Sequence, residues 1–197
     1  MNPKAFRLVL VSLLAALIAA GAIFSLPLPP PLPPVTLAVF FSLLAGCLLG
    51  PLWGTAAVGL YLLLGSAGLP VFANGSGGLA HFATPTGGFL LGYALAACCA
   101  GLVADRRRWS FPRALAGSLL GVAALYALGL PRFRHVMDAM PDRDMTMAAA
   151  FAIMLPYLLG DIVKAFAVAG LVRALKPLLL NRMPASESAS RKDGRPA

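Results

Sequence analysis

Apolar residues run almost without interruption through the first half of the chain, and polar residues are confined to a few short segments. Residues 8–104 contain no Asp, Glu, Lys or Arg. A membrane-spanning helix needs roughly 20 mostly apolar residues, so this stretch has room for about four such helices. Three segments divide it, because proline and clustered glycine end helices. They are a proline-rich stretch at 26–34, a Gly-Pro turn at 50–54 and a glycine-rich loop at 69–88.

Beyond residue 104 the same pattern predicts two further apolar helices, with a charged loop at 105–113 before them and a polar segment at 131–147 between them. The sequence therefore predicts an all-α fold, a polytopic membrane protein with six transmembrane helices in a single domain, residues 1–183. The predicted helices are 6–25, 35–50, 53–69, 87–104, 114–130 and 148–175. Residues 184–197 are polar and predict a disordered cytoplasmic tail.

Composition narrows the class of protein. The chain of 197 residues is 59% apolar and 12% charged, whereas a soluble domain carries about 25% charged residues. This difference excludes a soluble globular enzyme, a disordered chain and a secreted disulfide scaffold. The three cysteines lie inside apolar runs without metal-ligand spacing, so they predict packing residues and no metal site.

The basic residues indicate the orientation in the membrane. The net charge of +9 reflects loop charge on the cytoplasmic side rather than a nucleic-acid partner. With a cytoplasmic N-terminus, six helices place 12 Lys and Arg residues inside and 3 outside. The 12 are Lys4, Arg7, Arg106, Arg107, Arg108, Arg113, Arg173, Lys176, Arg182, Arg191, Lys192 and Arg195; the 3 are Arg132, Arg134 and Arg143. The split predicts a multi-pass protein of the cell membrane, surrounded by membrane lipid, with both termini in the cytoplasm. The basic start of the first helix is also typical of a cleaved signal peptide.

Two charged residues lie inside a predicted span. Asp161 and Lys164 are three residues apart, about a dozen residues into the last predicted helix, so they share a face near the middle of the bilayer. Each charge costs roughly 2.5–3.5 kcal/mol at that depth. Two interpretations explain them: an internal ion pair that fixes packing, or a polar anchor for a ligand. An acid accepts from ligand N–H groups, and a lysine donates to a carbonyl or carboxylate.

The glycine-rich outer loop is the second candidate site. Irregular backbone at membrane depth is tolerated where it is buried in protein or lines a cavity, and glycine lets the backbone approach a ligand. The residues that favour a binding loop over a flexible connection are Phe72, Asn74, Gly75, Ser76 and Gly77. Ser76 and His81 form no hydrolase motif, because Asn74 stands where G-x-S-x-G requires glycine. We therefore expect no catalytic residue, and the chain has no G-x-x-x-x-G-K-[ST] motif for binding ATP.

Small residues recur along the first predicted helix. They are Ala15, Ala16, Ala19 and Ala20. Small-xxx-small spacing lets two helices approach closely, so this face is a candidate docking surface. The abundance of alanine in the chain explains the same pattern without a partner.

Seven short segments follow one another along the chain. They are PVTL at 34–37, LLAGCLLGP at 43–51, YLLLG at 61–65, GLPVFA at 68–73, GSGG at 75–78, PTGGFLLG at 85–92 and GDIVK at 160–164. In this order the sequence resembles the BioY family, the biotin-specific substrate-binding (S) components of energy-coupling-factor (ECF) transporters. The resemblance extends over residues from about 5 to 176.

The resemblance implies a six-helix S-component fold that binds biotin near the outer face of the membrane. It implies that Asp161, Lys164 and Asn74, with the loop around Ser76, contact biotin. It further implies that the alanines of the first helix dock onto a transmembrane coupling subunit served by two ATPase subunits, although some members work without this module. ATP would then be used by the partner ATPases, and the chain itself would need no cofactor.

The chemistry of biotin agrees with these residues and leaves its pose open. In one pose Asp161 accepts from the ureido N–H and Lys164 donates to the ureido carbonyl. In another, the tail carboxylate is bound by Lys164 or by backbone N–H groups of the loop. Apolar parts of biotin predict Phe72, Tyr93 and Tyr157 as walls. The alternatives are an S component for another small vitamin, a proton-linked carrier that uses Asp161 and Lys164 as a relay, and a structural membrane subunit that needs no ligand.

Overall fold

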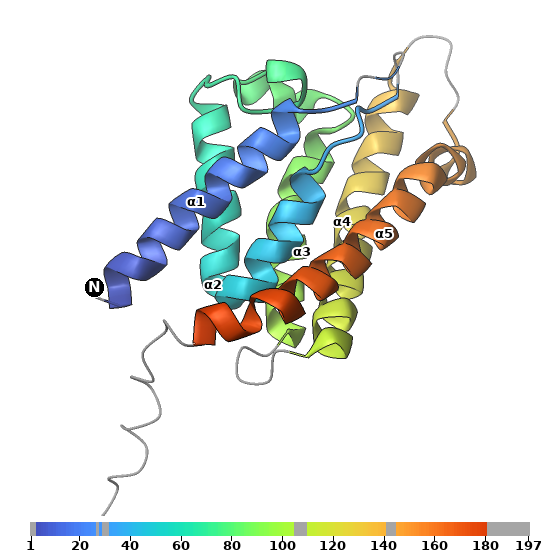
Figure 1. Ribbon diagram of the computed structural model, residues 1–197. Coiled ribbons are helices and arrows are strands. Elements are labelled where there is room, and N and C mark those ends of the chain that lie inside the picture. Colours follow the sequence, from blue (N-terminus) through green and yellow to red (C-terminus); the bar gives the residue numbers. More distant parts are fainter. Residues whose placement is uncertain (1–2, 27, 29–31, 105–109, 141–144, 181–197) are drawn as a thin grey trace, which may run out of the picture.

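The computed structural model describes residues 3–26, 28, 32–104, 110–140 and 145–180. Within these residues the chain forms five α-helices and two short 3-10 helices (Figure 1). The elements are α1 (Pro3–Ile23), α2 (Ala38–Ser66), η1 (Ala73–Gly75), η2 (Leu79–Ala83), α3 (Gly87–Val103), α4 (Phe111–Asp138) and α5 (Met147–Leu180). The predicted all-α fold class is confirmed.

Helix α2 reverses direction at Gly50. This residue has φ +83° and ψ 178°, which favours glycine, and Pro51 follows it. A Cβ atom added to Gly54 would lie 2.6 Å from the Cα atom of Gly46, whereas eight residues along a straight helix separate two Cα atoms by about 12 Å. The two halves of α2, residues 38–49 and 51–66, therefore fold back on each other as a hairpin (Figure 1). The turn lies where the sequence predicted one.

Close backbone contacts join α2, α3 and α4 into one block. Gly46 of α2 lies against the backbone of Ala97 of α3, and Gly101 of α3 lies against Pro51. Gly121 of α4 faces the backbone of α3 in the same way. Because these positions carry no side chain, the helices approach closely and gain extensive van der Waals contact.

Large apolar side chains cover the outer surfaces of the helices. Leu52 is 74% exposed, Leu63 70% and Leu102 65%, as expected for side chains that face lipid rather than water. By length and composition, four helices in the described residues can cross a membrane: α1, α2, α4 and α5. Helix α3 is a shorter apolar helix. The chain is a multi-pass membrane protein.

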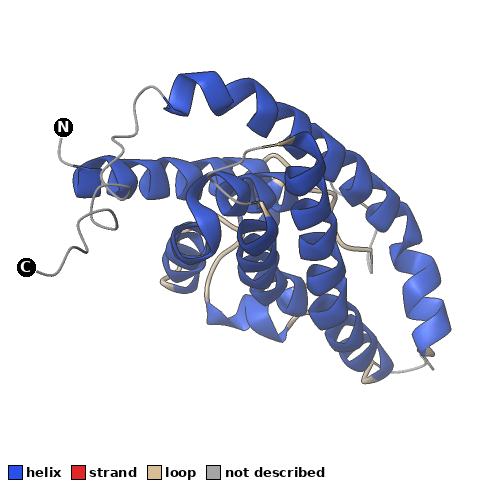
Figure 2. Ribbon diagram, turned by 90° about the horizontal axis from the view of Figure 1, so that it is seen from below, coloured by secondary structure: helices blue, strands red, loops and turns tan. Residues whose placement is uncertain are grey.

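Helix α5 is the least buried of these spans. Only 22% of its most apolar window is buried, compared with 39% for the windows of α2 and α4. Viewed from below, it curves around one side of the other helices (Figure 2). It packs mainly on α4 and more sparsely on α2.

The helix boundaries depart most from the predicted ones between α4 and α5. The prediction of a polar segment between helices at 131–147 was wrong, because α4 continues through Pro131 to Asp138. Phe133 and Met137 lie one turn apart and are fully buried against α5, so a helical apolar spacing was hidden in a stretch rich in charge. Helix α1 ends at Ile23 rather than at 25, and α5 extends to Leu180 rather than 175. Residues 105–109 and the predicted tail at 184–197 lie outside the described residues.

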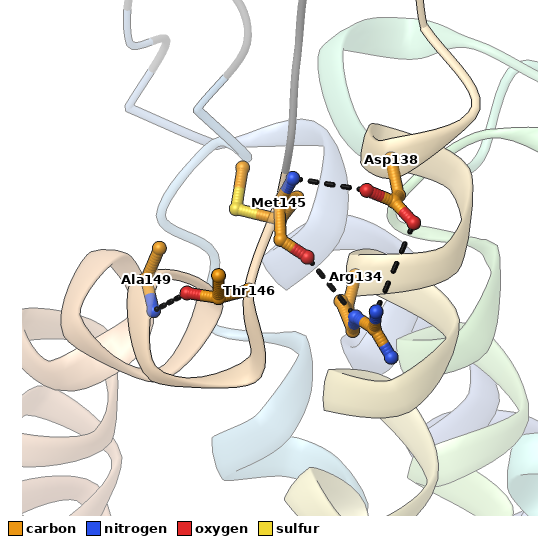
Figure 3. Close-up of polar contacts among 5 residues, drawn as sticks. All are labelled: Arg134, Asp138, Met145, Thr146 and Ala149. Atoms are coloured by element: carbon orange, nitrogen blue, oxygen red, sulfur yellow. Dashed lines mark hydrogen bonds and ion pairs between the residues drawn. The ribbon is translucent and has the colours of Figure 1, made fainter.

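Polar contacts fix the connection between α4 and α5 (Figure 3). The Arg134 Nε atom donates to the Met145 carbonyl at 3.0 Å, and its guanidinium lies 3.8 Å from the Asp138 carboxylate. Asp138 Oδ1 in turn accepts from the Met145 N–H at 3.0 Å. The Thr146 hydroxyl accepts from the Ala149 N–H at 3.2 Å and so caps the first turn of α5. These contacts set where α5 begins.

Candidate ligand-binding site

A cavity of about 540 Å³ is lined by all five helices, by residues 28 and 32–36 of the α1–α2 connection and by part of the loop between α2 and α3. Its volume lies within the roughly 300–1,000 Å³ that is typical of small-molecule sites. Most of the lining side chains are apolar or aromatic, and a few polar side chains converge among them. This combination is typical of a pocket that binds a small organic molecule.

Asp161 and Lys164 form the charged part of the cavity wall. Asp161 is 5% exposed, and its Oδ1 atom accepts from Lys164 Nζ at 2.8 Å. Its Oδ2 atom accepts from the Tyr126 hydroxyl of α4 at 2.9 Å. Lys164 Nζ also donates to the Thr36 carbonyl at 2.8 Å. A carboxylate offers about four acceptor positions and an ammonium three protons, so each group keeps capacity for a ligand.

Side chains of α5 hold the connection between α1 and α2. The Tyr157 hydroxyl donates to the Pro33 carbonyl at 2.7 Å, beside the contact from Lys164 to Thr36. Six of the nine residues at 26–34 are proline, so this connection has few N–H groups with which to satisfy its own carbonyls. Within it, the backbones of Leu26 and Val35 pair through hydrogen bonds of 2.9 and 3.1 Å.

The glycine-rich loop is tied to the end of α1. Asn74 has a positive φ of +58°, a conformation that Asn adopts more readily than most residues. Its backbone N–H donates to Ser25 Oγ at 3.2 Å, and its Oδ1 atom accepts from the Ser25 hydroxyl at 2.9 Å. Ser76 Oγ donates to the Ala73 carbonyl at 2.7 Å and also lies 3.2 Å from His81 Nδ1. These contacts give the loop a defined shape at the cavity.

Six of the nine predicted site residues line the cavity, although they come from distant parts of the chain. They are Asn74, Ser76, Tyr93, Tyr157, Asp161 and Lys164. The cavity lining does not include Phe72, Gly75 or Gly77. Phe72 is fully buried beneath the loop, with its ring centroid 5.5 Å from Tyr61 and 5.2 Å from His81. The two glycines shape the loop: Gly75 has φ +67°, and Gly77 lies against the Leu69 backbone.

Sequence reasoning missed Tyr126, the partner of Asp161. It also missed that the proline-rich connection and His81 belong to the cavity wall. The chain has four tyrosines, and all of them line the cavity: Tyr61, Tyr93, Tyr126 and Tyr157. A phenol inside an otherwise apolar span is a polar group that needs a partner. That signal could have selected Tyr126 from the sequence.

The four alanines of α1 do not share one face. Ala15 is 3% exposed and packs in a buried cluster with Ala38 and Tyr61, and Ala19 contacts the same cluster. Ala16 is exposed and Ala20 is half-buried. A docking surface on this helix can therefore use Ala16 and Ala20, whereas Ala15 is already used in packing against α2.

The arrangement is suited to binding rather than to catalysis. Ser76 and His81 are the closest approach to a nucleophile and a base, yet the Ser76 hydroxyl proton is directed to the Ala73 carbonyl. The histidine therefore has no serine proton to accept. At the other wall, Asp161 and Lys164 present a hydrogen-bond acceptor and a donor side by side.

The fold and the cavity define a polytopic membrane protein with a cavity of small-molecule size between its helices and two connecting loops. The chain belongs to the BioY family, whose family model matches residues 1–181. The family membership inferred from the seven sequence segments is thus confirmed.

Relatives and a solved structure agree with the family assignment. The chain is 38% identical over 176 residues to the biotin transporter BioY of Thermotoga maritima, covering 89% of this chain and 99% of that protein. It is 43% identical over 171 residues to the biotin transporter BioY of Rhodobacter capsulatus, covering 83% and 88%. The fold also matches the crystal structure of the S-component for biotin from an ECF-type ABC transporter. That match has a TM-score of 0.78 and 26% identity, and covers 89% of this chain and 93% of the other.

Proposed function

We propose that this protein captures biotin at the outer face of the membrane and delivers it to the cytoplasm as the substrate-binding subunit of an ECF-type transporter. It is a transport subunit and not an enzyme. The observation that carries the proposal is the buried group of Asp161, Lys164 and Tyr126 in the wall of a 540 Å³ cavity, in a chain of the BioY family.

The polar wall suits the ureido ring of biotin better than its carboxylate. Asp161 and Lys164 together carry no net charge, and they offer an acceptor beside a donor. A ureido group offers an N–H donor beside a carbonyl acceptor, so the two patterns are complementary. The thioether ring then lies among aromatic residues such as Tyr93 and Phe89, and the valerate tail extends toward Ser76 and His81 on the glycine-rich loop.

The membrane topology belongs to the same proposal. The reversal of α2 at Gly50 supports six passes, with each half of α2 crossing a locally thinned region because neither half reaches roughly 20 residues. The charge distribution of 12 basic residues against 3 supports cytoplasmic termini. The partners proposed from the family are a transmembrane coupling subunit and two ATPase subunits, which supply the energy of ATP. The exposed Ala16 is available for docking.

The test is biotin binding by the purified protein in detergent, with a variant that separates binding from folding. Asp161→Asn combined with Lys164→Met removes both buried charges together, so neither is left uncompensated. We expect the wild type to retain biotin and the double variant to fold but bind at least about 100-fold more weakly, since two charged hydrogen bonds are lost at about 1.5–3 kcal/mol each.

The single variants Asp161→Asn and Lys164→Ala should each weaken binding strongly. Wild-type affinity in the double variant would contradict the assignment of Asp161 and Lys164 to the biotin site. The ion pair would then have a role in packing alone. Binding of another vitamin in preference to biotin would contradict the substrate. Uptake that follows membrane potential rather than ATP would instead favour a proton-linked carrier.

A further inference from the structure

His81 lies in the cavity wall with one ring nitrogen beside Ser76. Its Nδ1 atom lies 3.2 Å from Ser76 Oγ, and the single hydroxyl proton of Ser76 is donated to the Ala73 carbonyl at 2.7 Å. Because that hydrogen bond uses the serine proton, the Ser76 oxygen matches the tautomer of His81 that has its proton on Nδ1. The neutral ring then has a free lone pair on Nε2, for which no partner occurs among the described residues.

The charges in the cavity wall do not balance an anionic ligand. Apart from the four phenols, the ionisable residues in the described lining are Asp161, Lys164 and His81. Asp161 and Lys164 cancel, so a ligand with a carboxylate brings one uncompensated negative charge into a cavity lined mostly by apolar side chains. Uncompensated charge in such a site is costly. One proton on the Nε2 atom of His81 restores neutrality and turns that atom into a donor.

We propose that His81 is the subsite for the ligand carboxylate and that it takes up a proton when the anionic ligand binds. The inference rests on the proposed function, because it uses the pose in which the ureido group meets Asp161 and Lys164. Ser76 acts as a positioning residue, since it holds Nδ1 and leaves Nε2 for the ligand. Unlike the ureido contacts, this contact would depend on pH.

The sign of the dependence follows from two opposing effects on the imidazole. Burial lowers the pKa of His81 below its ordinary value of 6.5 in the free protein, so the ring is neutral at pH 7. A bound carboxylate raises the pKa again, because an adjacent negative charge favours the protonated form. Between these two pKa values the complex holds more protons than the free protein. Affinity for the anion is therefore greatest at low pH and falls as pH rises, by at most about tenfold per pH unit for one proton.

Other charged or titratable groups line the same cavity as His81 or lie on the element beside it. Tyr61 comes from α2, Tyr93 from α3 and the Asp161–Lys164 pair from α5. On α4, Arg132 donates to the carbonyl of Phe82, the residue next to His81, at 3.4 Å. These groups are the same in the wild type and in a variant changed only at His81, so a difference between the two proteins reports on His81.

Titration calorimetry of the detergent-purified protein in buffers of different ionisation enthalpy counts the protons taken up on binding. Biotin should bind with net proton uptake at pH 7, and its affinity should fall from pH 6 to pH 8.5. Biotin methyl ester, which has no carboxylate, should bind without proton uptake and with an affinity independent of pH. His81→Gln should weaken biotin binding about tenfold at pH 6, the equivalent of a pKa shift of one unit, and the two proteins should converge at pH 8.5.

The chain supplies a matched control. Its other histidine, His135, is exposed on α4 and does not line the cavity, so His135→Gln should keep the proton uptake. The inference is overturned if wild type binds biotin without proton uptake, or if uptake persists in His81→Gln. The comparison of biotin with its methyl ester needs no variant, so equal proton uptake with both ligands overturns the inference even where His81→Gln does not fold. A wild-type protein that binds no biotin at any pH contradicts the proposed function instead.

Discussion

The block formed by α2, α3 and α4 and the single helix α5 are built in opposite ways. In the block, glycines lie directly against neighbouring backbone, as Gly46 does against Ala97. On α5, a Cβ atom added to Gly160 or Gly170 would meet nothing within 4 Å. Helix α5 packs through side chains such as Val168 and Val172, which are buried in the core. Hydrogen bonds from Tyr157 and Lys164 also tie it to the α1–α2 connection. The tightly packed block and helix α5 thus each supply part of the cavity wall, and α5 brings its charged groups, Asp161 and Lys164.

The largest effect is expected from adding a side chain inside the block. Gly46→Ala would place a Cβ atom against the Ala97 backbone, which cannot move without separating α2 from α3. Overpacking typically costs about 1–3 kcal/mol and occasionally more. Because the added atom here meets backbone rather than a flexible side chain, we expect little folded protein. Yield of the monodisperse protein and its thermal unfolding in detergent would measure the loss.

Gly170→Ala is the matched change on α5. It adds one methyl group in open space within a helix, and alanine is the better helix former by up to about 1 kcal/mol. Its stability should equal or slightly exceed that of the wild type. Equal damage from both glycine substitutions would show that the two regions do not differ in packing.

The next effect separates the two faces of α1. Ala16→Trp adds bulk on the exposed face, so it should leave biotin binding intact and abolish uptake driven by the coupling module. Ala15→Trp adds the same bulk at a position that is 3% exposed and packs against α2. That variant should fail to fold. Normal uptake by Ala16→Trp would remove the docking role from this face.

A smaller effect is expected where α4 meets α5 in the site. Tyr126→Phe removes the hydroxyl that donates to Asp161 Oδ2, and a hydrogen bond to a charged group is worth about 1.5–3 kcal/mol. Because Lys164 still holds Oδ1, we expect only about a tenfold loss of biotin affinity, measured by titration calorimetry. Tyr157→Phe is the matched phenol, and its partner is the neutral Pro33 carbonyl. A larger loss of affinity in the Tyr157 variant than in the Tyr126 variant would contradict the role of Tyr126 in orienting Asp161.

The sequence predicts the scaffold better than it predicts the contacts between its parts. The absence of charge over residues 8–104 and the Gly-Pro turn at Gly50 are local signals, and both correspond to observed structure. Asp161 and Lys164 stand out because charge is costly in an apolar span, and they do line the cavity. Tyr126 is 35 residues from Asp161 along the chain, and no local pattern records that pairing.

Two further errors have physical causes of the same kind. Phe72 was expected to form a wall because it is aromatic and lies in the binding loop. The loop instead folds so that this ring fills the space beside Gly65, beneath the cavity lining. The end of α4 was assigned to a polar segment because Arg132, Arg134 and Asp138 dominate its composition. Burial of Phe133 and Met137 against α5 decides its structure.

The smallest predicted effect concerns the start of α5. Thr146 accepts from the Ala149 N–H at 3.2 Å (Figure 3), and removal of such a cap costs about 1 kcal/mol. Thr146→Ala should therefore lower the melting temperature in detergent by a few degrees, whereas Thr146→Ser, which keeps the hydroxyl, should not. Since Arg134 and Asp138 also hold Met145 in place, α5 should keep its register and biotin affinity should stay unchanged. A fall in affinity without a change in stability would contradict this expectation. It would mean that the capped first turn of α5 helps to position Asp161 and Lys164 further along the helix.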